Sequence, residues 1–226
     1  MTEETEPAGG AGSDSSGMAA AVAAAGLRDL RDPRDMRALA HPTRLALLEA
    51  LTLHGALTAT QAAVYVGESP SSCSFHLRSL AKHRFVEETG DGRGRERPWR
   101  LVSAGTEMGY LFDDAKTQIA ADALWRMFLE RQFARLADAF ARRPSLPEEW
   151  AREQANLESL MWLTLDELRE INRVIFEIAL RFYPRLTDPS LRPEGAQPLE
   201  LLYFAYNVDQ GAAATGPEPA PGSEPS

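Results

Sequence analysis

Three helix starts in close succession constrain this chain more than any other feature of its sequence. Pro42 suits the first position of a helix, where its missing N–H would have no partner. Thr58 and Gln61 have the spacing of a capping box, and Ser69 precedes Pro70 as a cap for a third helix. The pattern predicts helices over about 42–54, 59–66 and 70–83, after a shorter helical stretch that begins near Arg34. A tight turn at 67–69 separates the last two helices.

The helix predicted over 70–83 has two faces of different chemistry. Its apolar residues Cys73, Leu77, Leu80 and Ala81 recur at helical spacing and share the face that packs on the preceding helices. The other face has small hydroxyls, one aromatic ring, two bases and no acid. These residues are Ser71, Ser72, Ser74, Phe75, Arg78, Ser79 and Lys82.

A basic loop follows this helix. Residues 85–89 and 99–102 read as two strands, and the glycine-rich loop 90–98 between them carries Arg93, Arg95 and Arg97. Helices joined by a tight turn and followed by a basic β-hairpin define a winged helix-turn-helix, a fold that binds double-stranded DNA.

The distribution of charge fits this interpretation better than the total does. The chain has a formal net charge of −9, but residues 28–103 hold twelve bases against nine acids, while the segments on either side are acidic. Positive potential concentrated on one module favours phosphate binding.

Each polar group of the module suits a part of the duplex. Serines let a helix approach base edges closely, Arg78 can reach a guanine edge or a phosphate, and Phe75 can contact a thymine methyl. Lys82 is expected to meet phosphate, and the three loop arginines are expected to follow the sugar-phosphate backbone or enter an adjacent minor groove.

The same residues carry a family resemblance. The runs RALAHPTRLALLEAL, LTATQAA, GESPSSCSFHLRSLAKH and GRGRERPWRL resemble the DNA-binding domain of ArsR-like regulators, in the branch whose recognition helix reads SSCSxHLRxL. The resemblance covers about residues 30–103. It implies a transcriptional regulator with base contacts from Ser71, Ser72, Ser74, Phe75, His76 and Arg78, and wing contacts from Arg93, Arg95 and Arg97.

Two departures from that family matter. Its metal-sensing members place a Cys-x-Cys pair in the helix before the turn, whereas this chain reads TATQAAVYV there and has only one cysteine. We therefore expect no metal site. The family also often has a glycine after the recognition helix, where this chain has His83 and Arg84, so a left-handed residue there would carry a cost.

The rest of the chain predicts a helical C-terminal region. A helix over 116–142 would be about 40 Å long, and its natural partner is the same helix in a second subunit. Its apolar stripe is a dimer seam or, less favoured, the wall of a pocket for a small-molecule effector. The stripe consists of Trp125, Leu129, Phe133, Leu136 and Phe140. Further helices are expected over 148–154 and from a capping box at Thr164 to Pro184, with strands over 156–163 and 199–208.

These elements give a mainly α fold: a winged helix-turn-helix of three helices plus a β-hairpin over 18–103, and a helical dimerisation or effector region over 104–210. The polar ends 1–17 and 211–226 are expected to be disordered. No apolar run approaches the roughly 18 residues that a membrane span needs, which predicts a cytoplasmic protein without a membrane partner.

The leading hypothesis is a homodimeric regulator, acting as a repressor, on a pseudo-palindromic operator. The alternative is a winged helix that binds proteins and has little affinity for DNA. We expect no enzyme and no cofactor, because no Ser/His/Asp order or phosphate-binding loop occurs. Cys73 is favoured as a small core residue over a redox switch.

Overall fold

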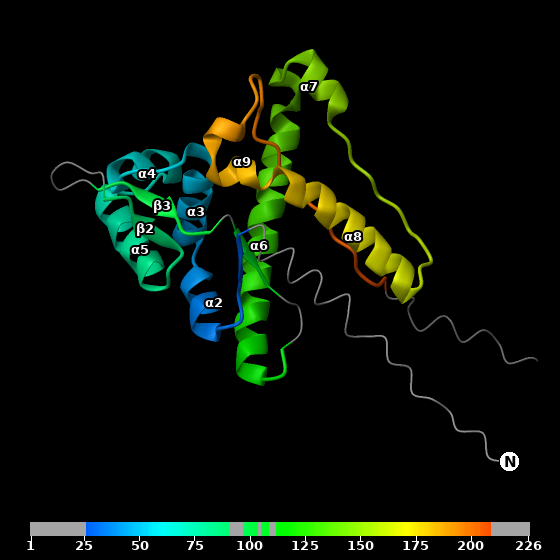
Figure 1. Cartoon of the computed structure of the whole chain (residues 1–226), viewed down its shortest axis with the longest axis horizontal. Helices are drawn as coiled ribbons and strands as arrows, with labels where there is room; N and C mark the ends of the chain where they lie inside the picture. Colours follow the sequence, from blue (N-terminus) through cyan, green and yellow to red (C-terminus); the bar gives the residue numbers. More distant parts are fainter. Residues whose placement is uncertain (1–25, 91–96, 104, 109–111, 209–226) are drawn as a thin grey trace, which may run out of the picture. The chain divides into compact units, whose positions relative to one another are not determined.

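The computed structural model of the chain describes all residues except 1–25, 91–96, 104, 109–111 and 209–226. By its internal contacts the chain divides into two units, one up to Glu194 and one from Gly195. Figure 1 shows the helices that make up most of the first unit. The tails predicted to be disordered, residues 1–17 and 211–226, lie outside the described residues.

Four helices open the described part of the chain, and their ends match the sequence signals. They are α2 (Pro33–Leu39), α3 (Pro42–His54), α4 (Ala59–Val66) and α5 (Pro70–Lys82). Both halves of the Thr58–Gln61 capping box are formed at the start of α4. Gly67 ends α4 in the left-handed conformation, with φ of 72°, and the Ser69 hydroxyl accepts from the Ser72 N–H to begin α5. The predicted helix–turn–helix is thereby confirmed.

Two small sheets join this helical group. Strands β2 (Val86–Glu88) and β3 (Trp99–Leu101) pair antiparallel, with Glu87 opposite Arg100, and Leu57 makes an isolated bridge to Trp99. This pair confirms the predicted hairpin strands. Strands β1 (Leu27–Asp29) and β4 (Gly105–Glu107) pair in parallel. The sequence did not predict these two strands, because three residues are too few to form a recognisable periodic pattern.

One hydrophobic core lies among these helices and strands. Its most completely buried large side chains, each under 2% exposed, come from α2, α3, α5 and β2 and from the helix over residues 115–142. They include Met36, Leu39, Leu47, Leu77, Leu80, Leu124 and Val86. The core therefore fixes α5 against the other helices through the apolar face that its spacing predicted.

The long helix α6 (Ala115–Arg142) confirms the prediction for 116–142, and Figure 1 shows it running well past the helix-turn-helix. Its N-cap is Asp114, and hydrogen bonds from Thr117 hold the pKa of this carboxyl below its usual value. Its buried residues all lie in the first third of the helix. Further along, Arg131 Nε donates to Glu49 Oε1 of α3 at 2.6 Å, which ties the middle of α6 to the helix-turn-helix.

Further helices follow α6 along the described chain. They are the 3-10 turn η1 (Arg143–Ser145), α7 (Glu148–Glu153), α8 (Leu165–Phe182), α9 (Pro184–Thr187) and the 3-10 turn η2 (Pro189–Leu191). The capping box at Thr164 and Glu167 is formed at the start of α8. In the part of the chain that the structure describes, no helix is long and apolar enough to cross a membrane.

The two strands predicted for the C-terminal region are wrong. Residues 156–163 and 199–208 have no regular secondary structure. Apolar residues in these segments suggested strands, but a strand also needs a neighbouring strand to pair its backbone N–H and C=O groups. No such pairing is formed in the described residues of either segment.

Candidate nucleic-acid interface

Helix α5 presents a narrow exposed stripe on the side opposite the core. Ser71, Phe75, Arg78 and Lys82 are all exposed, and steps of four, three and four residues place them on one face of the helix. We call these four residues the α5 stripe. Phe75 is 63% exposed. The α5 stripe contains no acid.

The serines at the start of α5 lie beside this stripe. Ser71 Oγ is 3.0 Å from the capping Ser69 Oγ, and Arg78 Nη1 donates to Ser74 Oγ at 2.8 Å. Ser72 and Ser74 are half-buried. The N-terminal turns of α5 therefore have little side-chain bulk, so that another molecule can approach the backbone closely.

His76 lies apart from the α5 stripe. Its ring centroid is 4.4 Å from that of His41, the N-cap of α3, and its Nδ1 is buried without a hydrogen-bond partner among the described residues. Burial lowers the pKa of His76, and the neighbouring His41 and Arg44 lower it further. The DNA contact predicted for His76 stays a prediction, and its position between α3 and α5 also suits a role in orienting α5.

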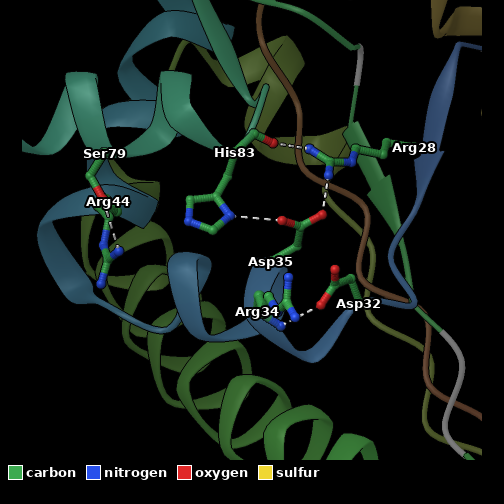
Figure 2. Close-up of polar contacts among 7 residues, drawn as sticks. All are labelled: Arg28, Asp32, Arg34, Asp35, Arg44, Ser79 and His83. Carbon is green, nitrogen blue, oxygen red and sulfur yellow. Dashed lines mark hydrogen bonds and ion pairs between the residues drawn. The ribbon is translucent and has the colours of Figure 1, made fainter.

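A second residue of α3 reaches α5 from the same side. Arg44 Nη1 donates to Ser79 Oγ at 3.4 Å (Figure 2), and burial lowers the pKa of the guanidinium. The Nε of Arg44 is buried without a partner in the part of the chain described here. Neither Arg44 nor His41 stood out in the sequence, because each belongs to a helix start that is explained by capping alone.

The C-terminal end of α5 is held by an ionic network from distant segments. His83, the C-cap, has its Nδ1 2.8 Å from Asp35 Oδ1 of α2, and its carbonyl accepts from Arg28 Nη1 of β1 at 2.5 Å. Arg28 also pairs with Asp35 and lies over the Phe85 ring, 4.3 Å from its centroid. Figure 2 shows Arg28, Asp35 and His83 pointing toward one another.

The next residue, Arg84, bears the backbone cost that the sequence predicted at this position. Arg84 has φ of 57°, the left-handed region, and it is the only described residue other than glycine with a positive φ. This conformation turns the chain from α5 into β2. The network around His83 therefore stabilises a strained corner.

The wing is described only in part. Arg97 is exposed, and its Nη1 lies 3.0 Å from Glu88 Oε2 across the hairpin. Arg100 similarly pairs with Glu87 at 2.7 Å. The predicted contact residues Arg93 and Arg95 lie outside the described residues. Of the three predicted wing arginines, the structure therefore locates one, at the base of the loop.

The stripe predicted on the long helix is uncovered toward its C-terminal end. Trp125 and Leu129 are half-buried, whereas Phe133, Leu136 and Phe140 are exposed, Phe133 by 53%. None of the five lines the groove of about 410 Å³ that lies between α2 and α6. That groove is lined by Arg37, Lys116, Ile119, Ala120 and Ala123.

Comparison with known proteins supports the central part of this description. Residues 39–89 match the model of a helix-turn-helix domain family, which spans α3, α4, α5 and β2. No curated protein matches the chain. In the described part of the chain, no group of three or more His, Cys, Asp or Glu side chains is placed to hold a metal ion. The matched domain indicates a DNA-binding regulator.

Proposed function

We propose that this protein regulates transcription as a homodimer that binds a pseudo-palindromic operator in double-stranded DNA. The observation that carries the proposal is the acid-free α5 stripe on the second helix of a helix-turn-helix. In this architecture the second helix enters the major groove, and its N-terminal residues meet the base edges. Repression would follow where the operator overlaps the site of polymerase.

The roles within α5 follow from position and chemistry. Ser71, Ser72 and Ser74 meet base edges without strong selectivity, because a hydroxyl can donate or accept. Phe75 contacts a thymine methyl, and Arg78 binds a guanine edge or a phosphate. Lys82, near the end of the helix, contacts phosphate. His76 is the weakest member of this set, because it is half-buried against His41.

The wing adds contacts that position the protein rather than select a sequence. Arg97, together with Arg93 and Arg95, would follow the sugar-phosphate backbone or enter the adjacent minor groove. The ion pair between Arg97 and Glu88 does not oppose this role, because Arg97 remains 61% exposed. An exposed pair of this kind contributes at most about 1 kcal/mol and is readily exchanged for phosphate.

Dimerisation would place the two α5 helices one helical turn of DNA apart. The exposed C-terminal end of the α6 stripe, with Phe133, Leu136 and Phe140, supports a seam between the α6 helices of two copies. The same stripe is the predicted wall of an effector pocket, and the identity of an effector stays open. In this proposal residues 18–103 bind DNA and residues 104–210 bring two copies together.

A second candidate function is protein binding by the helix-turn-helix itself. It is favoured by an apolar patch away from the core on α3 and α4: Val64 is 80% exposed, and the exposed Tyr65 stacks on His54 with ring centroids 3.8 Å apart. The overall charge of −9 would also suit a module that does not bind nucleic acid. The α5 stripe is the reason to prefer DNA.

Substitution of Arg78 tests the proposal. Fluorescence anisotropy with the DNA upstream of the protein's own gene should show binding that Arg78→Ala weakens by about 1–3 kcal/mol, with relaxed specificity at the contacted base. Arg126→Ala on α6 is the matched control, because it removes the same charge from an exposed site far along the chain. Equal affinities for the two variants would contradict the assignment of α5, and binding of protein but not of DNA would favour the second candidate.

A further inference from the structure

Arg44 of α3 is a half-buried cation without an acidic partner in the described part of the chain. The hydrogen bond from its Nη1 to Ser79 Oγ is long, at 3.4 Å, and its Nε is buried without an acceptor there. Burial lowers the pKa of the guanidinium, and no described acid offsets this effect. A charge removed from water is costly unless an opposite charge compensates it. The protein alone therefore satisfies Arg44 only in part.

One acid lies close to this end of α3, but it acts on other groups. Glu68 Oε1 accepts from Thr43 Oγ1 at 3.4 Å, and the charge of Glu68 opposes the lowering of the pKa of His41 and of His76. The same charge is not among the causes that shift the pKa of Arg44. Arg44 thus keeps an unbalanced positive charge beside α5.

The contact with Ser79 places Arg44 at one edge of the α5 stripe (Figure 2). At about 100° per residue, Ser79 lies about 70° from the centre of the stripe, and Ser74 lies about 70° from it on the other side. Ser74 accepts a hydrogen bond from Arg78 at 2.8 Å. The stripe therefore has an arginine–serine contact along each edge, one within α5 and one from α3.

A helix that enters the major groove has a sugar-phosphate backbone on each side. The groove is about 12 Å wide, close to the diameter of about 10–12 Å of a helix with its side chains. The edges of such a helix therefore face phosphates, while its centre faces base edges. A guanidinium suits an edge position, because its planar set of N–H donors matches two oxygens of one phosphate.

We propose that Arg44 binds a phosphate of the DNA backbone beside α5 and so holds this helix in the major groove from one side. The inference rests on the proposed function, since it requires that α5 enters the groove. The phosphate would supply the negative charge that Arg44 lacks in the free protein. The contact comes from neither α5 nor the wing, the two elements to which the sequence assigned DNA contacts.

Binding of DNA from upstream of the protein's own gene, measured by anisotropy at several salt concentrations, tests this inference. Arg44→Gln should lower the affinity at least about tenfold and reduce the salt slope by about one, because one phosphate contact is lost. Arg44→Lys should keep most of the slope, because it keeps the charge while losing the planar set of donors. Arg126→Gln is the matched control, because it removes the same charge from an exposed site on α6.

Thermal melting without DNA separates this role from a purely structural one. Arg44→Gln should melt at or above the temperature of the wild type, because the substitution removes a half-buried charge that the free protein does not compensate. An arginine that only supports the fold would behave in the opposite way. Its loss would lower the melting temperature and leave the salt slope unchanged, and that pair of results would overturn the inference.

The outcomes distinguish this inference from the proposed function. If the wild type binds with a steep salt dependence and Arg44→Gln binds as Arg126→Gln does, the inference fails while the proposed function stands. If the wild type shows no salt-dependent binding, the proposed function fails and the inference fails with it. A lower affinity and a smaller slope in Arg44→Gln, without a lower melting temperature, support the inference.

Discussion

Cys73 lies at the centre of the packed face of α5, with none of its surface exposed. Burial raises the pKa of its thiol, and the charge of Glu68 raises it further. The reactive form of cysteine is the thiolate, so both effects make this thiol inert. Its place in the fold is that of a small apolar residue between α5 and the core.

We predict that Cys73 does not react in the folded protein. A colorimetric disulfide reagent should label it only slowly in buffer and completely once the chain is unfolded in guanidinium. DNA affinity should also be unchanged by mild peroxide treatment. Rapid labelling of the folded protein would reinstate a redox role for this residue.

The His41–His76 pair makes stability depend on acidity. Burial lowers the pKa of both histidines in the folded protein, and Arg44 lowers both further. The unfolded chain, with histidine pKa near 6.5, then binds protons more readily than the folded chain as the pH falls below that value. The contribution of these two histidines to stability is therefore fully present above about pH 6.5, and it is lost as the pH falls below that value.

We expect the melting temperature to fall between pH 7 and pH 5, and to fall less in His76→Gln. His54→Gln is the control, because this exposed histidine stacks on Tyr65 outside the pair. Thermal melts of the three proteins at both pH values provide the measurement. The same loss of stability in His76→Gln as in the wild type would show that the pair does not cause it.

Local signals were sufficient for residues whose partners are close in the chain. The Thr58–Gln61 box, the Ser69 cap and the burial of Cys73 and Leu77 were all predicted from spacing. Arg28 was missed, because its contact with His83 spans 55 residues and depends on a strand too short to predict. Pairing at such separations is set by the tertiary fold rather than by local pattern.

At the scale of elements, α6 is fastened to the helix-turn-helix by Glu49 of α3. Arg131 contacts both carboxylate oxygens of Glu49, and Arg135 Nη1 lies 3.0 Å from Oε1. The hydrogen bond to Glu49 is also the main reason that the pKa of the Arg131 guanidinium is raised. Because α6 carries the predicted dimer seam, this contact sets the position of the seam relative to α5.

A double-mutant cycle should detect this connection. Glu49→Ala and Arg131→Ala are each expected to lower the free energy of unfolding by about 1–2 kcal/mol, since the pair is partly buried and bidentate. In the double variant the free energy of unfolding should fall by clearly less than the sum of the two single losses. Urea denaturation measures all four proteins, and Arg126→Ala combined with Glu49→Ala provides the additive control. If the losses of unfolding free energy caused by Glu49→Ala and Arg131→Ala were additive, that result would contradict the proposed coupling.

Helices were predicted better than strands in this chain. Helices α6 and α8 were placed to within about two residues, because each has a periodic apolar stripe and a clear end signal. The segments 156–163 and 199–208 are apolar without being strands, since their surroundings decide whether their backbone can pair. Many of their apolar side chains are exposed, Leu157 by 92% and Tyr206 by 81%.

At the scale of the whole molecule, the unequal distribution of charge favours DNA binding over the protein-binding alternative. A net charge of −9 would repel DNA if it were spread evenly, whereas residues 28–103 are net positive. A protein that binds through this module should release counterions from DNA, and its affinity should fall steeply as salt rises. A module that binds only proteins would show no salt-dependent affinity for DNA.

The most direct measurement is the affinity for DNA from upstream of the protein's own gene as a function of salt concentration. We expect specific binding in which the logarithm of the association constant falls linearly with the logarithm of the salt concentration, with a slope reduced by about one when Arg97 is changed to alanine. No binding to this DNA at low salt, or an affinity that does not respond to salt, would contradict it.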